Sequence, residues 1–240
     1  MRKIACVFLL MSAVLSGRTQ TWFDIGLKAE GGLNLLINSN ISNDADFTYK
    51  PSGGYGFGAK LGVNFGDHEV TFDGIYSRFN QNWQVNILDT ASGGDEFYDK
   101  NFYFNAFDLI LMYRYNNPNG SYVEIGPQWS VVMSAGGSNT YAPGSDGDIA
   151  SKMVNGFPSA VIGFGQYMFG TENFGITTGL RFKYALGDMF NDPGTYPSPN
   201  AYDSYAPSNA FSAMFVIEFN YDLGYMARAQ CKQRTKLVLF

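Results

Sequence analysis

The segment from Trp22 to Ile37 reads Trp-Phe-Asp-Ile-Gly-Leu-Lys-Ala-Glu-Gly-Gly-Leu-Asn-Leu-Leu-Ile and alternates between apolar and polar or small residues. Nearly all large apolar side chains fall on odd-numbered positions, whereas Asp24, Lys28 and Glu30 fall on even-numbered positions. Successive side chains of a β-strand point to opposite faces, so a period of two over this length predicts a strand and not a helix.

Seven further segments show the same alternation, which predicts an all-β chain of eight antiparallel strands. Thirteen charged residues in the eight segments share the polar face, and only Arg78 lies on the apolar face. A charge on a lipid-facing position of a membrane barrel costs roughly 2–4 kcal/mol, so this placement favours a membrane barrel. The seven segments cover residues 55–66, 69–78, 107–115, 122–133, 159–168, 175–186 and 211–222.

Composition excludes several classes of protein. The 240 residues suit one domain, and their 15% charged content lies below the roughly 25% of soluble domains. A net charge of −5, without a basic stripe outside the C-terminal tail, argues against nucleic-acid binding. One histidine and two cysteines leave little room for a zinc site or a histidine-based triad, so we expect no metal and no cofactor.

The N-terminus is typical of a secretory signal peptide. Arg2 and Lys3 precede an apolar run over residues 4–15, which is shorter than the roughly 20 residues of a membrane-spanning helix. Its removal leaves Cys231 as the single cysteine, which excludes an internal disulfide. We therefore predict a signal peptide over 1–19, a barrel over 20–223 and a basic periplasmic tail over 224–240.

The connections between the predicted strands alternate in length. Short connections lie at 66–68, 116–120 and 170–173, so both termini fall at the short-turn end. This is the layout of a Gram-negative outer-membrane barrel with short periplasmic turns and long extracellular loops. The long connections cover residues 39–53, 80–100, 136–155 and 188–209.

A soluble barrel such as a lipocalin would turn its apolar face inward, so the pattern alone leaves that alternative open. Aromatic residues near the strand ends favour the membrane, because they form girdles at its two interfaces. The chain also ends in Phe240, a terminal aromatic residue of the kind common in outer-membrane proteins. The predicted girdle residues are Trp22, Tyr55, Tyr76, Tyr113, Tyr115, Phe174, Tyr184 and Tyr221.

Two segments carry a family resemblance. Residues 107–115 (Phe-Asp-Leu-Ile-Leu-Met-Tyr-Arg-Tyr) and 122–130 (Tyr-Val-Glu-Ile-Gly-Pro-Gln-Trp-Ser) resemble the central hairpin of the PorT-like outer-membrane β-barrel proteins of Bacteroidota. Residues 26–34 resemble the first strand of that family. The resemblance implies a monomeric barrel, and some relatives serve protein secretion. The tail after residue 223 departs from the family, whose members usually end with the last strand.

Charged residues on the polar face are the candidate site. Spacing from the short turns places Lys60 opposite Asp73, and Arg114 diagonal to Glu124. Eight strands leave barely enough room for side chains, so we expect a paired network that fills the lumen in preference to an open channel. The predicted network comprises Lys28, Glu30, Lys60, Asp73, Asp108, Arg114, Glu124, Arg181, Lys183 and Glu218.

Catalysis is not expected. Barrel lipases and proteases need a histidine near their external rim, whereas His68 lies in a short turn beside Asp67 and is expected to be solvated. Asp73 and Asp108 could be considered as a catalytic pair of carboxylates. Ion pairing with basic residues nearby on the polar face explains their presence better. Asp146 and Asp148 lack the remaining spacing of a calcium loop.

The predicted function is a structural or surface-binding role through the acidic, aromatic external loops. Lipid, lipopolysaccharide and a protein partner at these loops or at the tail are the expected partners. The tail carries Arg228, Lys232, Arg234 and Lys236, which suit a periplasmic partner or headgroups, and an unstructured extension is the alternative. Two further functions stay open: a narrow pore for small solutes, and an accessory subunit of a secretion or assembly machine.

Overall fold

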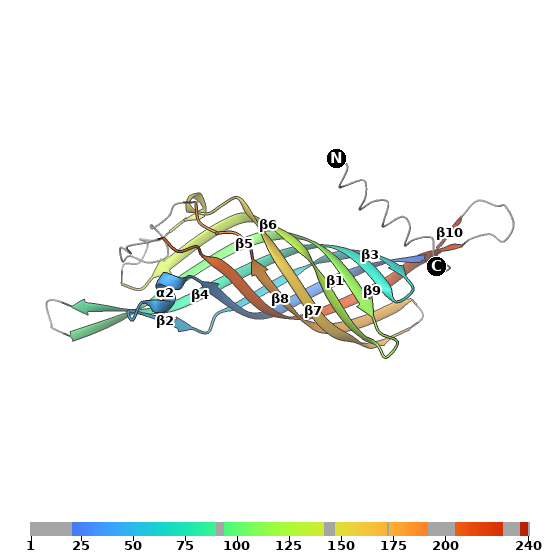
Figure 1. Ribbon diagram of the computed structural model, residues 1–240, viewed down its shortest axis with the longest axis horizontal. Coiled ribbons are helices and arrows are strands. Elements are labelled where there is room, and N and C mark those ends of the chain that lie inside the picture. The colour runs from blue at the N-terminus through green and yellow to red at the C-terminus, as the bar shows by residue number, and fades with distance from the viewer. Residues whose placement is uncertain are drawn as a thin grey trace.

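The computed structural model describes residues 21–89, 94–141, 147–171, 173–191, 205–227 and 236–239 (Figure 1). These residues form tilted antiparallel strands that wrap into a barrel. The predicted signal peptide, Cys231 and Phe240 lie outside the described residues.

Eight strands form the ring, in the order β1-β3-β4-β5-β6-β7-β8-β9, and pairing of β1 with β9 closes it. The predicted eight-stranded antiparallel barrel is therefore confirmed. The bounds are β1 Thr21–Ile37, β3 Gly53–Phe65, β4 His68–Asp89, β5 Gly94–Asn116, β6 Ser121–Asn139, β7 Gly156–Gly170, β8 Phe174–Ala185 and β9 Asn209–Ala227.

The β1–β9 seam runs the full length of the first strand. Its register begins at Thr21 opposite Met226 and ends at Ile37 opposite Asn209, with one bulge between Phe23 and Asp24. A closed ring leaves no unpaired edge in the wall, so every ring strand has two partners.

Tight turns join the strands at the end that holds Thr21 and Ala227. Gly66 and Gly120 adopt φ angles of +68° and +84° in two of these turns, a conformation that glycine accepts without a Cβ clash. The longer connections lie at the opposite end of the ring (Figure 1). The predicted alternation of short and long connections is present.

The predicted loop over 80–100 was wrong, because β4 and β5 continue through most of it. Their register extends from His68 opposite Tyr115 to Asp89 opposite Gly94, and the hairpin projects beyond the ring (Figure 1). The long connections also hold the short strand β2 (Phe47–Lys50), which pairs with β4, the helix α2 (Ser39–Asn43) and the 3₁₀ helix η1 (Ala150–Lys152). The alternation of inward and outward side chains continues through this hairpin. This pattern explains why β4 and β5 remain paired strands and do not form a loop.

The described part of the tail is also a strand. β9 continues past residue 223 to Ala227, and β10 (Lys236–Leu239) pairs with its last residues, Gly224 to Ala227. Residues 228–235 lie outside the described residues.

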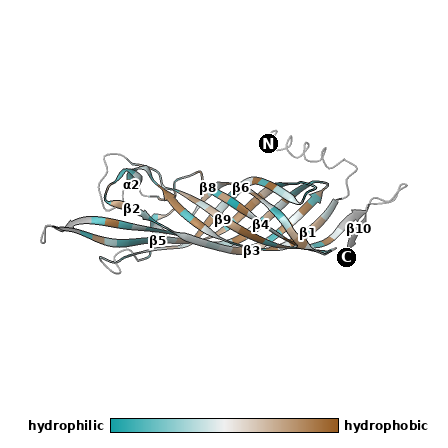
Figure 2. Cartoon of the chain, turned by 90° about the horizontal axis from the view of Figure 1, so that it is seen from below, coloured by the Kyte–Doolittle hydropathy of each residue, from teal (hydrophilic) through white to brown (hydrophobic). Residues whose placement is uncertain are grey.

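The apolar faces of the strands point away from the ring. Leu27 and Leu33 are 66% and 64% exposed. Figure 2 shows hydrophobic and hydrophilic residues alternating along the strands of the ring. Phe174 and Tyr221 lie on this face near the short turns, and Tyr184 lies on it near the other end. Trp22 is an exception to the predicted girdle, because it lines a pocket at the short-turn mouth of the lumen.

Candidate functional site

The interior of the barrel contains two zones of opposite chemistry. The zone nearer the short turns, which we call the ionic layer, holds seven carboxylates and five cationic side chains, all buried. The zone nearer the long connections, which we call the apolar plug, holds a cluster of buried hydrophobic residues. The ionic layer comprises Asp24, Lys28, Glu30, Lys60, Glu69, Asp73, Asp108, Arg114, Glu124, Arg181, Lys183 and Glu218.

Glu218 of β9 is the hub of the ionic layer. Its carboxylate is 1% exposed and lies 2.8 Å from Lys60 Nζ, 2.9 Å from Arg114 Nη2 and 3.0 Å from Lys28 Nζ. These cations come from β1, β3 and β5, so the hub joins strands on different sides of the lumen. A buried carboxylate needs this compensation, because desolvation of an unpaired charge costs several kcal/mol.

Asp73 and Glu124 continue the network from the hub. Asp73 Oδ2 lies 2.6 Å from Lys28 Nζ and 3.2 Å from Arg181 Nη1. Glu124 accepts from Arg181 at 2.8 Å and from Arg114 at 2.9 Å. Arg181 therefore bridges two carboxylates, and Arg114 bridges three, those of Glu69, Glu124 and Glu218. This role suits the planar fork of donors of an arginine.

Separate ion pairs lie at the two ends of the layer. Toward the short turns, Lys60 Nζ lies 2.6 Å from Glu69 and 3.1 Å from Asp24. Toward the long connections, Lys183 forms ion pairs with Glu30 and, at 3.7 Å, with Asp108. All ten predicted residues therefore lie in the ionic layer, seven of them in the network around Glu218 and three in the separate group of Lys183, Glu30 and Asp108.

The registers agree only in part with the sequence-based expectation. Lys60 lies opposite Asp73 as predicted, but its ammonium group binds Asp24, Glu69 and Glu218 across the lumen. The predicted diagonal placement of Arg114 and Glu124 was wrong, because the two are direct cross-strand partners. Asp24 and Glu69 were outside the predicted set, although their positions on the polar face are a sufficient signal.

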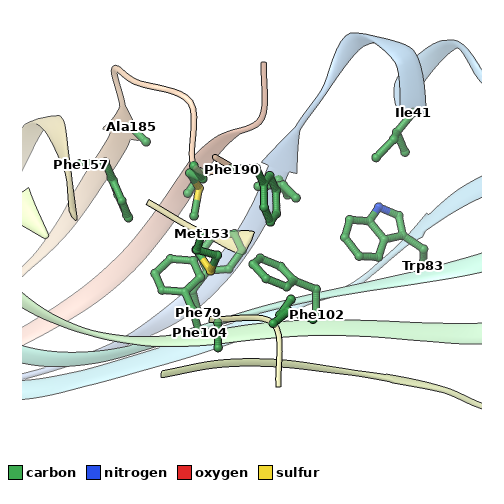
Figure 3. Packing of buried hydrophobic residues seen from close by; sticks show 14 of the residues in the cluster. Ile41, Phe79, Trp83, Phe102, Phe104, Met153, Phe157, Ala185 and Phe190 are labelled. Carbon is green, nitrogen blue, oxygen red and sulfur yellow. The ribbon is translucent and has the colours of Figure 1, made fainter. Parts of the chain in front are cut away.

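The apolar plug blocks the lumen at its other end. Phe79 and Phe104 stack with ring centroids 4.9 Å apart, and Phe102 lies 5.7 Å from Phe190 of a long connection (Figure 3). Met153 from another long connection points into the same cluster. The plug comprises Leu36, Ile41, Phe47, Phe79, Trp83, Val85, Tyr98, Phe102, Phe104, Ala106, Ala135, Ile149, Met153, Phe157, Ala185, Met189, Phe190 and Ala210.

Between the two zones lies a small cavity of about 40 Å³, lined by Glu30, Gln128 and Phe104 among others. Glu30 Oε2 and Gln128 Oε1 have no hydrogen-bond partner among the described residues. The cavity has room for a few water molecules, each of which needs about 10–15 Å³, and these would satisfy both oxygens. A second cavity, of about 220 Å³, opens at the short-turn mouth, and Lys60 and Arg114 form part of its lining.

The polarity of the two strand faces inverts along β4. From Val70 to Tyr76 the outward residues are apolar or glycine, and the inward positions include Glu69 and Asp73. From Asn80 onward the outward residues are Asn80, Asn82 and Gln84, whereas Phe79, Trp83 and Val85 are buried inside. β5 inverts at the same level, since Phe107 is outward below it and Phe104 is inward above it.

His68 does not lie in the turn as predicted, because it is the first residue of β4. Its Nδ1 atom lies 2.6 Å from the Tyr113 hydroxyl, and its ring stacks on Phe65 and Tyr113. Among the described residues, no group of three His, Cys, Asp or Glu side chains is arranged to hold a metal ion. No helix of the described chain is long and apolar enough to cross a membrane.

Several solved structures are similar to this chain. Neisserial surface protein A (NspA) is 12% identical, with a TM-score of 0.42 over 82% of this chain and 95% of that chain. OprG from Pseudomonas aeruginosa is 12% identical, with a TM-score of 0.39 over 85% and 96%. The outer-membrane protease OmpT from Escherichia coli is 8% identical, with a TM-score of 0.40 over 85% and 96%.

No family model and no curated protein sequence matches the chain. The resemblance to the PorT-like barrels therefore stays a prediction from residues 26–34 and 107–130.

Proposed function

We propose that the chain is a non-catalytic outer-membrane protein that uses a sealed barrel to hold a binding surface outside the cell. The lower part of the barrel, from the short turns to Arg78, is called the stem, and the part beyond it is called the head. The stem lies in the bilayer with its short turns in the periplasm. The head lies in water and presents the surface that binds a partner.

The observation that carries this proposal is the inversion of face polarity at Arg78 and Phe79. Below it, the strands are apolar outside, and their inward positions hold the ion pairs beside a small apolar cluster of Ile75, Ile110, Met112 and Val161. An apolar outer face over a polar interior is the arrangement that lipid favours. Above it, β4 and β5 carry mostly polar side chains outside and mostly apolar side chains inside, the arrangement that water favours. The outward series from Val70 to Arg78 covers nine residues of β4, which agrees with the roughly 9–11 residues of a membrane-spanning strand.

Two barriers in series support a sealed lumen. A solute would have to break the ion pairs of Glu218 and then displace Phe102 and its neighbours in the plug. Breaking a buried ion pair by removing one partner costs about 3–5 kcal/mol, so the network opposes passage strongly. A structural role for the ionic layer is therefore favoured over a pore.

The head supplies the surface for a partner. The β4–β5 hairpin extends beyond the ring with Phe97 59% exposed, and Tyr141 beside it is 61% exposed. Tyr141 packs on the buried plug residue Tyr98 with 5.8 Å between ring centroids, which holds the exposed Tyr141 ring against the hairpin. Exposed aromatic side chains on an otherwise polar surface favour a binding role. Asp146, one of the two aspartates considered for a calcium site, lies outside the described residues.

Cysteine labelling tests the position of the membrane. In a Cys231→Ser background, the variants Gln84→Cys and Phe72→Cys each place one outward thiol on β4, in the head and in the stem. In lipid vesicles, a membrane-impermeant maleimide should label Gln84→Cys and spare Phe72→Cys, and detergent should expose both. Equal labelling of the two variants in vesicles would contradict the assignment of the stem to the bilayer.

Planar-bilayer recording tests the sealed lumen. The folded protein should give no unitary conductance, whereas a double variant Glu218→Gln/Phe102→Ala weakens both barriers and should give openings. A shift in gel mobility between unboiled and boiled samples confirms that each variant is folded. Steady unitary conductance of the unmodified protein would support the narrow pore instead.

An accessory role in a secretion or assembly machine is the second candidate, and β10 favours it. β10 pairs only with β9 in the described sheet, and this pairing extends the sheet beyond the closed ring at the short-turn end. A strand edge in this position offers a docking surface for a periplasmic protein. Crosslinking in cells, followed by purification in mild detergent, should recover a periplasmic partner with the full chain but not with a chain that ends at Ala227. A clean monomer in both cases would exclude this role.

A further inference from the structure

Arg78 breaks the rule that governs the outer wall. Among the described residues of the stem, no other charged side chain faces outward from the ring. A lipid-facing arginine costs about 2–4 kcal/mol at the bilayer midplane and much less near an interface. Arg78 lies at the level where the face polarity inverts, which is the interface on the side of the head. The position therefore tolerates a charge, and the next question is what neutralises it.

The guanidinium of Arg78 is held in place but not neutralised. Its Nε donates to Asn80 Oδ1 at 3.1 Å, and its Cζ lies 4.2 Å from the centroid of the Tyr103 ring. Within the residues that the structure describes, it forms no ion pair with a carboxylate. The two contacts leave the terminal nitrogens for another anion, and an arginine fork matches the oxygens of a phosphate group.

The wall below Arg78 is hollowed. An apolar depression of about 800 Å³ lies on the outside of the barrel, and its lining includes Ala59, Leu61, Phe72 and Gly74. Gly74 lies four residues below Arg78 on the outward face of β4, and Ala59 is its cross-strand partner. Both residues are small, and the depression continues from them to Phe174 and Tyr221 near the short turns, a course that suits an acyl chain.

We propose that Arg78 and this hollow bind one phosphorylated lipid of the leaflet that faces the head. The phosphate binds the terminal nitrogens of Arg78, and an acyl chain lies in the hollow beside Gly74 and Ala59. The proposal rests on the membrane placement of the stem, and it adds a specific lipid site to it. In an outer membrane the lipid of this leaflet is a phosphorylated glycolipid, so bisphosphorylated lipid A is the appropriate probe.

Native mass spectrometry of the full folded chain in mild detergent tests the headgroup site. Equal concentrations of bisphosphorylated lipid A and its dephosphorylated form are offered together. The unmodified chain should retain the phosphorylated form about tenfold better, which is the ratio expected for one charge-assisted contact. Arg78→Gln should bring this ratio close to one, and Arg78→Lys should give an intermediate ratio. Lys50→Gln removes an exposed cation of the head and serves as the matched control with an unchanged ratio.

A second pair of variants tests the hollow. Ala59→Leu fills the depression and should reduce retention of both lipid forms by a similar factor. Ala160→Leu makes the same change on the outward face of β7, outside the hollow, and should leave retention unchanged. A difference in lipid retention between these two variants indicates a specific acyl-chain site. Equal retention would indicate general coverage of the wall by detergent and lipid.

Three results would overturn the proposal: no preference for the phosphorylated form, an unchanged ratio in Arg78→Gln, or displacement of the lipid by millimolar inorganic phosphate. The last result would assign the site to a free anion. Gel mobility verifies that every variant is folded. Maleimide labelling in vesicles reports the placement of the stem independently, so failure of the lipid site and failure of the proposed function are distinguishable.

Discussion

The ionic layer and the apolar plug line the same lumen and are built in part from the same strands, yet they share almost no chemistry. In the proposed placement, lipid covers the outer wall of the stem and takes up the apolar side chains, so the inward positions can hold ion pairs. In the head, water covers the outside, so the inward positions form a hydrophobic core like that of a soluble protein. Under this placement, the solvent outside the wall explains the chemistry inside it. Changes within each zone test this interpretation.

The largest effect is expected at the hub of the ionic layer. Glu218→Gln keeps the shape of the side chain but leaves Lys28, Lys60 and Arg114 without their shared counter-charge. We expect a loss of about 3–5 kcal/mol in the free energy of unfolding, as for other broken buried pairs. Urea unfolding in lipid vesicles, followed by tryptophan fluorescence, measures it. Glu96→Gln, on the exposed hairpin, is the control and should leave stability unchanged.

A loss in the free energy of unfolding is also expected in the plug, where it comes from a cavity and not from an unpaired charge. Phe102 is fully buried and packs on Phe79, Phe104 and Phe190, so Phe102→Ala leaves a cavity. The expected cost is about 3 kcal/mol, at the lower end of the usual range because the nearby connections can relax. The same unfolding assay measures it, and a loss below about 1 kcal/mol would show that the plug is not a packed core.

A smaller effect is expected for methyl groups added to the two faces of the stem. A Cβ on Gly58 would lie 2.0 Å from the Gly74 carbonyl oxygen, whereas a Cβ on Gly74 would meet only the Phe107 ring, at 3.3 Å. Gly58→Ala should therefore destabilise the barrel by about 1–3 kcal/mol, as overpacking does, and Gly74→Ala should have little effect. Thermal unfolding followed by gel mobility compares the two. Equal midpoints would argue against the close strand approach at Gly58.

The smallest effect is expected for an ion pair outside the lumen. Lys50 and Asp99 lie 2.6 Å apart in the head, but their side chains are 37% and 60% exposed. Water screens such a pair, so Lys50→Gln should cost at most about 1 kcal/mol. The loss in the free energy of unfolding is compared with that of Glu218→Gln under the same conditions. The difference between the two losses measures how much burial adds to the strength of an ion pair. A loss as large as that of Glu218→Gln would mean that exposure does not distinguish the two zones.

The sequence was sufficient to predict the stem, because one alternation rule places every side chain on one of two faces. The inward positions of Lys28, Arg114 and Glu218 and the pairing of Lys60 with Asp73 follow from that rule and from the short turns. The ion pairs themselves do not, because long side chains cross the lumen to strands that are distant in the sequence. Lys60 and Glu218 are 158 residues apart.

The head was missed because its residues were interpreted as loops. The alternation of Phe79, Gln81, Trp83 and Val85 continues the odd-numbered face of β4, but the apolar side chains there have moved to the inward positions. A rule that assumes one polarity for the whole strand cannot follow this inversion. The contributions of Ile41, Met153 and Phe190 depend on the paths of the long connections, which no period in the sequence indicates.

The seam between β1 and β9 has a consequence for assembly. Glu218 reaches its position only when the last strand docks, yet the cations that it compensates belong to strands made much earlier. An incomplete chain therefore exposes Lys28, Lys60 and Arg114 without that partner. Insertion of such a chain into a bilayer would be opposed by the free energy of desolvating these charges. We therefore expect membrane insertion to be most favourable for a chain that is complete through β9, because only that chain carries the counter-charge of Glu218.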